Sequence, residues 1–235
     1  MRTIRILAVI TAIFGISMLA SSGLGARAEF WDYRTGLSLL RNAAYVGMAA
    51  MMLTLIALFV TRPRGGALAV LLVALGLAVV TVAVPRGFTR KAQSVPPIHD
   101  ITTDTADPPA FVAVLPLRAS APNSAVYAGD SIAALQQTAY PDVQPVMLDD
   151  APPEAFDRAL AAAEEMGWDI VARESAEGRI EATATTTWFG FKDDVVIRVR
   201  PTAAGSRIDV RSVSRVGRSD VGANAARIRS YIKVL

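Results

Sequence analysis

The stretch IHDITTDTADPP, residues 98–109, contains the only histidine of the chain. His99 is followed directly by Asp100, and Asp104 lies four residues further on. An imidazole beside a carboxylate can act as a general base with its orienting group, and the same side chains can bind a cation. The alternative, which we favour, is structural, because Asp and Thr side chains commonly cap turns in segments rich in proline.

The rest of the chain limits what chemistry this polar peptide could support. There is no cysteine, so disulfides, zinc–thiolate sites and thiol nucleophiles are excluded. A nucleophile would have to be Ser or Thr, and the sequence contains no G-x-S-x-G elbow, H-E-x-x-H motif or glycine-rich phosphate loop. We therefore expect no catalytic residue, no metal ligand and no cofactor. A hydrolase or metal-dependent enzyme that uses His99 and neighbouring carboxylates is the alternative.

A second candidate site is a group of arginines near the C-terminus, Arg211, Arg215 and Arg218. They precede a predicted helix whose N-cap would be Ser219 or Asp220, and arginines beside free helix N–H groups are typical of an anion site. Such a site could bind a lipid phosphate or a cell-envelope polymer. The favoured alternative is internal pairing, because residues 92–170 carry a net charge of −10 and residues 171–235 a net charge of +5.

The elements that must position these residues begin in a membrane. Hydrophobic residues make up 52% of the chain, and three apolar runs cover residues 4–24, 43–60 and 67–84, of which only the first contains a charged residue, Arg5. At a rise of about 1.5 Å per residue even the shorter runs reach roughly 27 Å, enough to cross a hydrocarbon core. Residues 1–91 are therefore predicted to be a membrane region of three transmembrane helices in a lipid bilayer.

The connections between these spans decide the topology. The sequence TRPRGG, residues 61–66, predicts a tight turn, whereas residues 30–42 read as a segment lying on the membrane surface. The arginine count, four against six, disfavours a cytoplasmic N-terminus, but the first 20 residues resemble a signal-anchor. We expect the N-terminus inside, the protein in the cytoplasmic (inner) membrane, and the C-terminal domain on the periplasmic side. Cleavage of the first segment after Ala28 is left open.

Beyond the membrane region two further parts are expected. Residues 92–143 are rich in proline and predict an extended segment that docks on the domain after it. Residues 144–235 alternate as strands and helices in the order β-α-β-β-β-β-α. This pattern predicts an α+β, two-layer extracytoplasmic domain with an antiparallel sheet and two helices. The pI near 9.5 comes from arginines that flank the membrane spans, so we expect no nucleic-acid partner.

Several motifs resemble those of domain-of-unknown-function family 1499, from about Val95 to the C-terminus. They are IHDITTD followed by PPAF, then AYPDVQP, FGFKDDVVIRV and SRVGRSDVGANAARI. The stretch WDYRTG before the second span is similar to a membrane-bound subset of that family. Other members resemble exported lipoproteins, which implies a domain outside the cytoplasmic membrane. The resemblance brings no reaction, cofactor or catalytic residue.

Two functional classes follow from these patterns. The favoured one is an integral membrane protein whose C-terminal domain is a non-catalytic binding or scaffolding module of the cell envelope. Its partners would be the lipid bilayer and another membrane or envelope component. The other class is the enzyme described above.

Overall fold

The computed structural model describes residues 2–235 and forms two compact units. The first unit comprises the chain up to Lys91 together with the turn Thr187–Gly190. The second comprises Ala92–Thr186 and Phe191–Leu235.

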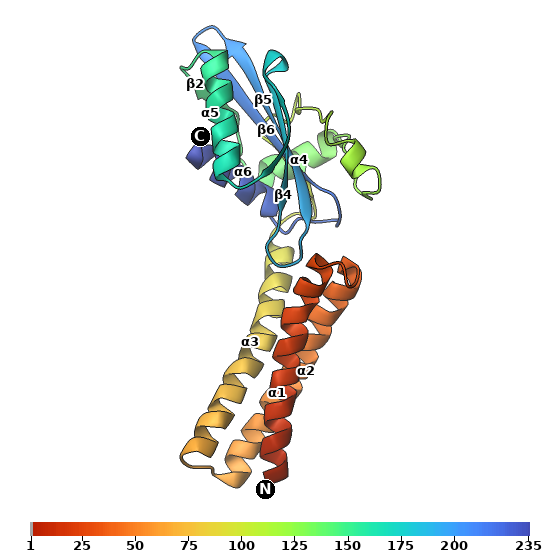
Figure 1. The fold of residues 1–235 in the computed structure, drawn as a ribbon, viewed down its shortest axis with the longest axis vertical. Helices are drawn as coiled ribbons and strands as arrows, with labels where there is room; N and C mark the ends of the chain where they lie inside the picture. Colours follow the sequence, from red (N-terminus) through yellow and green to blue (C-terminus); the bar gives the residue numbers. More distant parts are fainter. Residues whose placement is uncertain (1) are drawn as a thin grey trace. The chain divides into compact units, whose positions relative to one another are not determined.

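Three long helices make up the first unit: α1 (Arg2–Arg27), α2 (Tyr33–Thr61) and α3 (Gly66–Ser94) (Figure 1). Each is long and apolar enough to cross a membrane. Large aliphatic and aromatic side chains such as Leu7, Phe14 and Phe59 point outward and are exposed. Such a surface suits contact with lipid. It is formed by the three apolar runs of the sequence, which lie within these helices.

Small residues form the contacts between α1 and α2. The buried positions of α2 recur every three or four residues: Gly36, Leu40, Ala43, Gly47, Ala50, Thr54 and Ala57. Those of α1 follow the same spacing: Ala8, Ala12, Gly15, Leu19 and Ser22. This heptad-like spacing with small side chains lets two helix backbones approach closely, which is the usual basis of helix packing in lipid.

The structure corrects the expectation of a surface segment at residues 30–42. Asp32 caps α2 by accepting hydrogen bonds from the N–H groups of Arg34 and Thr35, and the helix is continuous from Tyr33. The small-residue spacing explains this, because it runs unbroken past Arg41 and packs the first turns of α2. The helix α3 also extends beyond the third apolar run, which ends at residue 84. It continues through Pro85 to Ser94, and a proline is tolerated inside such a helix.

The second unit is an α+β domain, as predicted. Its sheet contains β1 (Asp100–Thr102), β2 (Val146–Leu148), β3 (Asp169–Glu174), β4 (Arg179–Thr185), β5 (Lys192–Thr202) and β6 (Gly205–Ser214). All pairs are antiparallel, in the order β1-β6-β5-β4-β3, and β2 also pairs with β6. The helices are α4 (Asp130–Ala139), α5 (Pro152–Glu165) and α6 (Ala223–Val234). From β2 onward the order is the predicted β-α-β-β-β-β-α.

One face of the sheet carries the main hydrophobic core. Alternate residues of the strands, among them Ile180, Ile197 and Ile208, are buried against α5 and α6. The ring of Tyr231 in α6 stacks on Trp168, with ring centroids 5.2 Å apart, and its hydroxyl donates to the carbonyl of Ala159 at 2.9 Å. This layer gives the domain its two-layer character.

The opposite face of the sheet is polar and is also covered. Residues 104–127 cover it on the side away from α5 and α6, as irregular chain interrupted by one 3-10 helix at Pro116–Arg118 (Figure 1). A small apolar cluster of Phe111, Val114, Val196 and Val213 joins the segment to the strands. Around that cluster the buried side chains are charged, and they include Asp100 and Arg211, two of the residues that the sequence singled out.

Candidate functional site

Asp100 and Arg211 face each other on this covered side of the sheet. Asp100 in β1 lies opposite Val213 of β6, and its carboxylate accepts from Arg211 Nε at 2.9 Å and from Nη2 at 2.7 Å. Arg211 also donates to the carbonyls of Pro109 and Ala125. Its guanidinium therefore fixes three separate points of the preceding segment to β6.

The same guanidinium is held between two aromatic rings. The Arg211 carbon Cζ lies 5.1 Å from the ring centroid of Phe111 and 5.5 Å from that of Tyr127. Burial, followed by the nearby Asp100 carboxylate, raises the pKa of Tyr127 to about 12. The buried Tyr127 hydroxyl has no hydrogen-bond partner among residues 2–235. With its donors used on the chain itself, Arg211 is not available to an external anion in this arrangement.

Arg215 lies in a second buried ionic group, around Asp194 of β5. Asp194 is fully buried and pairs with Arg215 at 2.8 Å and with Arg118 at 2.6 Å. The hydroxyl of Thr183 donates at 2.7 Å to Asp194 Oδ1, the oxygen that also accepts from Arg215 Nη2. Burial alone would raise the pKa of Asp194, but hydrogen bonds from Arg215, Thr183 and Arg118 outweigh it and hold the pKa below its usual value.

Asp104 takes part in a third group near the other end of the sheet. Its carboxylate pairs with Arg207 at 2.6 Å and with Arg200 at 3.3 Å, and it accepts from the backbone N–H groups of Ala106 and Asp107. Burial acts to raise the pKa of Asp104, yet these bonds and charges leave it lowered. The fully buried Asp209 shares Arg198, Arg200 and Arg207 with it.

Glu181 of β4 holds the covering segment through its backbone. It is fully buried, and its two oxygens accept the N–H groups of Val112, Ala113 and Val114 at 2.9–3.0 Å. Arg179 forms an ion pair with the same carboxylate. A charged acceptor that satisfies three consecutive backbone donors fixes the local path of the chain closely.

His99 and Arg218 do not join these groups. The Nδ1 atom of His99 lies 3.3 Å from the carbonyl oxygen of Arg218, while the Asp100 carboxylate is turned toward Arg211. The Arg218 side chain is exposed. His99 and Asp100, adjacent in sequence, therefore do not form a base with its orienting carboxylate. Within residues 2–235 no group of three His, Asp or Glu side chains is arranged to hold a metal ion.

Sequence reasoning missed several deeply buried charges: Glu181, Asp194, Asp209 and Arg118. A strand that alternates aliphatic and charged residues normally exposes its charged face to water. The sequence offers one signal for these ion pairs, which is that an acidic segment precedes a basic sheet and helix region. This predicts electrostatic attraction between the two regions but does not identify which residues pair.

The covering segment also presents apolar side chains to the outside. Val112, Leu115 and Leu117 are 53%, 46% and 53% exposed, although they alternate with the buried Phe111, Val114 and Arg118. We call these three exposed residues the apolar loop. They lie within residues 112–118, where Glu181 accepts backbone N–H groups and Asp194 binds the side chain of Arg118.

Comparison with known proteins gives one match. Residues 100–235 match the family described as "Protein of unknown function (DUF1499)". No curated protein and no solved structure matches the chain.

Proposed function

Because the chain belongs to the DUF1499 family, whose description names no activity, we propose a function from geometry: the domain is a membrane-anchored, non-catalytic binding module of the cell envelope. The observation that supports it is the apolar loop, whose large aliphatic side chains are exposed while buried charges fix its backbone. Its partner would be an apolar surface of another membrane or envelope protein.

The cost of the buried charges favours a purpose beyond stability. Taking carboxylates and guanidinium groups out of water is expensive, and aliphatic residues in their place are often as stabilising. What the charges add is position, because Glu181 accepts three backbone N–H groups of one short stretch and Asp194 binds Arg118 at the end of that stretch. Rigid, pre-positioned aliphatic side chains bind a partner without a large loss of conformational entropy.

The proposed location is the periplasmic side of the cytoplasmic membrane. Three helices that each cross the bilayer would leave the two ends of the chain on opposite sides, and Arg2 and Arg5 before or at the start of the first apolar run support the cytoplasmic side for residue 2. An export-dependent alkaline phosphatase fused after Leu235 should be active. Activity of a cytoplasmic fluorescent reporter at the same position, with no phosphatase activity, would refute this location.

Site-specific photo-crosslinking in cells tests the binding function. A photoreactive residue at Leu115 or Leu117 should give a discrete adduct with one envelope protein. The matched control is Met147 in β2, which is more exposed, at 61%, but lies outside the apolar loop. The double variant Leu115→Ser/Leu117→Ser should keep its melting temperature and lose the adduct formed from Val112. Equal adducts at Met147 and in the loop would contradict the proposal.

A further inference from the structure

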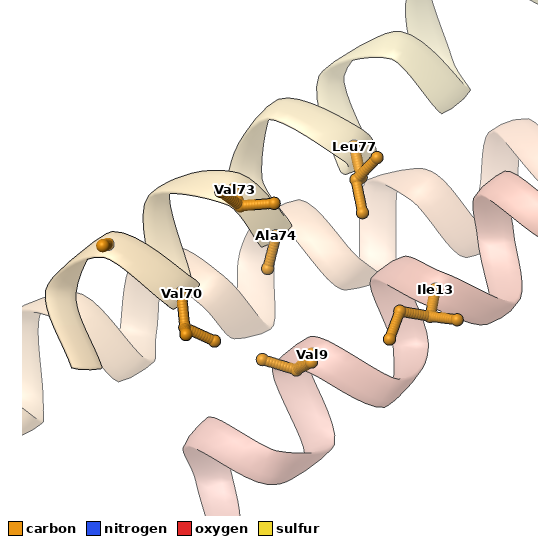
Figure 2. A pocket seen from close by; sticks show the side chains of 7 residues that line it. Val9, Ile13, Val70, Val73, Ala74 and Leu77 are labelled. Atoms are coloured by element: carbon orange, nitrogen blue, oxygen red, sulfur yellow. The ribbon is translucent and has the colours of Figure 1, made fainter. Parts of the chain in front are cut away.

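A groove runs between α1 and α3 at the end of the bundle where both helices begin. Its inner part has a volume of about 260 Å³ and is lined only by aliphatic side chains: Val9, Ile13, Ala69, Val70, Val73, Ala74 and Leu77. Figure 2 shows Val9 and Ile13 on one wall and Val70, Ala74 and Leu77 on the other, with α2 behind. The helix α1 packs closely on α2, and a gap remains between α1 and α3.

The groove continues into an outer part that ends in positive charge. The outer part, of about 540 Å³, shares Val9 and Val70 with the inner one and is lined at its mouth by Arg2 and Arg5. Arg5 donates through Nε to the hydroxyl of Thr61 and through Nη2 to its carbonyl, which holds the guanidinium at this place. The groove therefore has an apolar interior and a cationic mouth.

The positive charge at the mouth has no acidic neighbour in the first unit. Glu29 and Asp32 are the only acids before Asp100, and they lie after the end of α1 and before the start of α2. Arg5 and Thr61 are near the opposite ends of those helices. No acid of the first unit therefore neutralises the charge at the mouth.

The length of the groove matches one leaflet of a bilayer. From Arg2 to Ile13 the helix rises about 17 Å, and half of a hydrocarbon core is about 15 Å. We propose that this groove binds an anionic phospholipid, with one acyl chain between Val9 and Val70 and the phosphate on Arg2 and Arg5. Cationic pockets between membrane helices are a known means of holding anionic headgroups. This site is independent of the function proposed for the domain.

The test uses the purified full-length chain in detergent micelles that contain equal amounts of dioleoyl phosphatidylglycerol and dioleoyl phosphatidylcholine. Native mass spectrometry then counts the retained lipids. The wild type should retain phosphatidylglycerol in preference. Arg2→Gln should weaken that retention about fivefold, the contribution expected of one arginine at a membrane surface. Arg64→Gln, which removes the same charge from the same end outside the groove, should retain the lipid as the wild type does.

A second pair of variants tests the acyl-chain part without changing charge. Val70→Trp fills the shared section of the groove and should abolish retention, whereas Val80→Trp, on the exposed surface of the same helix, should leave it unchanged. Equal retention of both lipids by the wild type, or normal retention by Val70→Trp, would refute the site. Loss of a dimer in Val70→Trp would also refute it, because the groove would then be an interface between two copies.

Discussion

The Asp100 carboxylate and the Arg211 guanidinium form a two-point ion pair in which both side chains are buried. The two residues are 111 positions apart, and their bond joins the proline-rich segment to β6, an interior strand of the sheet. The proline-rich segment is therefore part of the fold of the domain.

We expect loss of either partner to be costly. Asp100→Ala leaves a buried cation without its counter-ion, and removing one member of a buried pair typically costs about 3–5 kcal/mol. Asp100→Ala/Arg211→Met should be less destabilised than the sum of the single variants. Urea unfolding of the fragment 92–235 measures these costs. Asp142→Asn, which breaks the exposed pair with Arg229, is the control and should cost at most about 1 kcal/mol. Strict additivity at Asp100 and Arg211 would mean that the pair contributes no coupling.

Glu181→Gln should loosen the apolar loop. The amide keeps one acceptor oxygen but turns an NH₂ group toward backbone donors, and an unsatisfied buried group costs about 1–3 kcal/mol. Limited proteolysis should then cut within residues 112–118 faster than in the wild type. Glu177→Gln removes the other partner of Arg179 at the surface and should not change the rate. Equal cleavage rates in the two variants would show that Glu181 does not fix the loop.

The sequence predicted the elements better than their contacts. Apolar runs and alternation predicted the three helices and the order of strands and helices along the chain, because these depend on local periodicity. They also suggested a break near Arg41 that the small-residue spacing from Gly36 to Gly47 overrides. The pairing of Asp100 with Arg211 depends on register between strands far apart in sequence. Charge totals cannot specify such a register.

The stability of the domain should fall in acid partly because of Asp194. Its pKa is lowered in the folded state, so the unfolded chain binds its proton more readily. The resulting stabilisation is complete above the unfolded pKa of about 3.9 and is lost as the pH falls through the lower folded value. Asp194→Asn should be less stable at pH 7 and should lose less stability between pH 5 and pH 2. An unchanged slope would place the acid sensitivity at other carboxylates.

Asp220 provides a contrast of opposite sign. Burial raises its pKa despite hydrogen bonds from the N–H groups of Asn224 and Gly222. Its protonation on acidification therefore favours the folded state and offsets part of the loss caused by Asp194. Asp220→Asn should make the fall in stability between pH 5 and pH 3 steeper than in the wild type. A shallower fall would contradict the direction of this pKa shift.

Removal of residues 92–143 should prevent cooperative folding. A fragment that starts at Gln144 lacks Ile98 and Ile101 of the main core, and it leaves Glu181 without its backbone donors and Asp194 without Arg118. Near-ultraviolet circular dichroism should show a folded fragment 95–235 and an unfolded fragment 144–235. Equal melting temperatures for the two fragments would mean that the segment contributes nothing to the fold.

His99 should matter less than its neighbours. The contact of its imidazole Nδ1 with the Arg218 carbonyl is long at 3.3 Å, and the bonds to its backbone carbonyl do not depend on the side chain, so His99→Ala should cost no more than about 1 kcal/mol. Asp104→Ala should cost more, because it removes a carboxylate shared by Arg200 and Arg207. Thermal unfolding of the fragment 95–235 gives the order of the two effects. The photo-crosslink from Leu115 in cells measures partner binding independently of stability. The His99→Ala variant should preserve that adduct. A His99→Ala protein that keeps its melting temperature but loses the adduct would require a direct role for the imidazole.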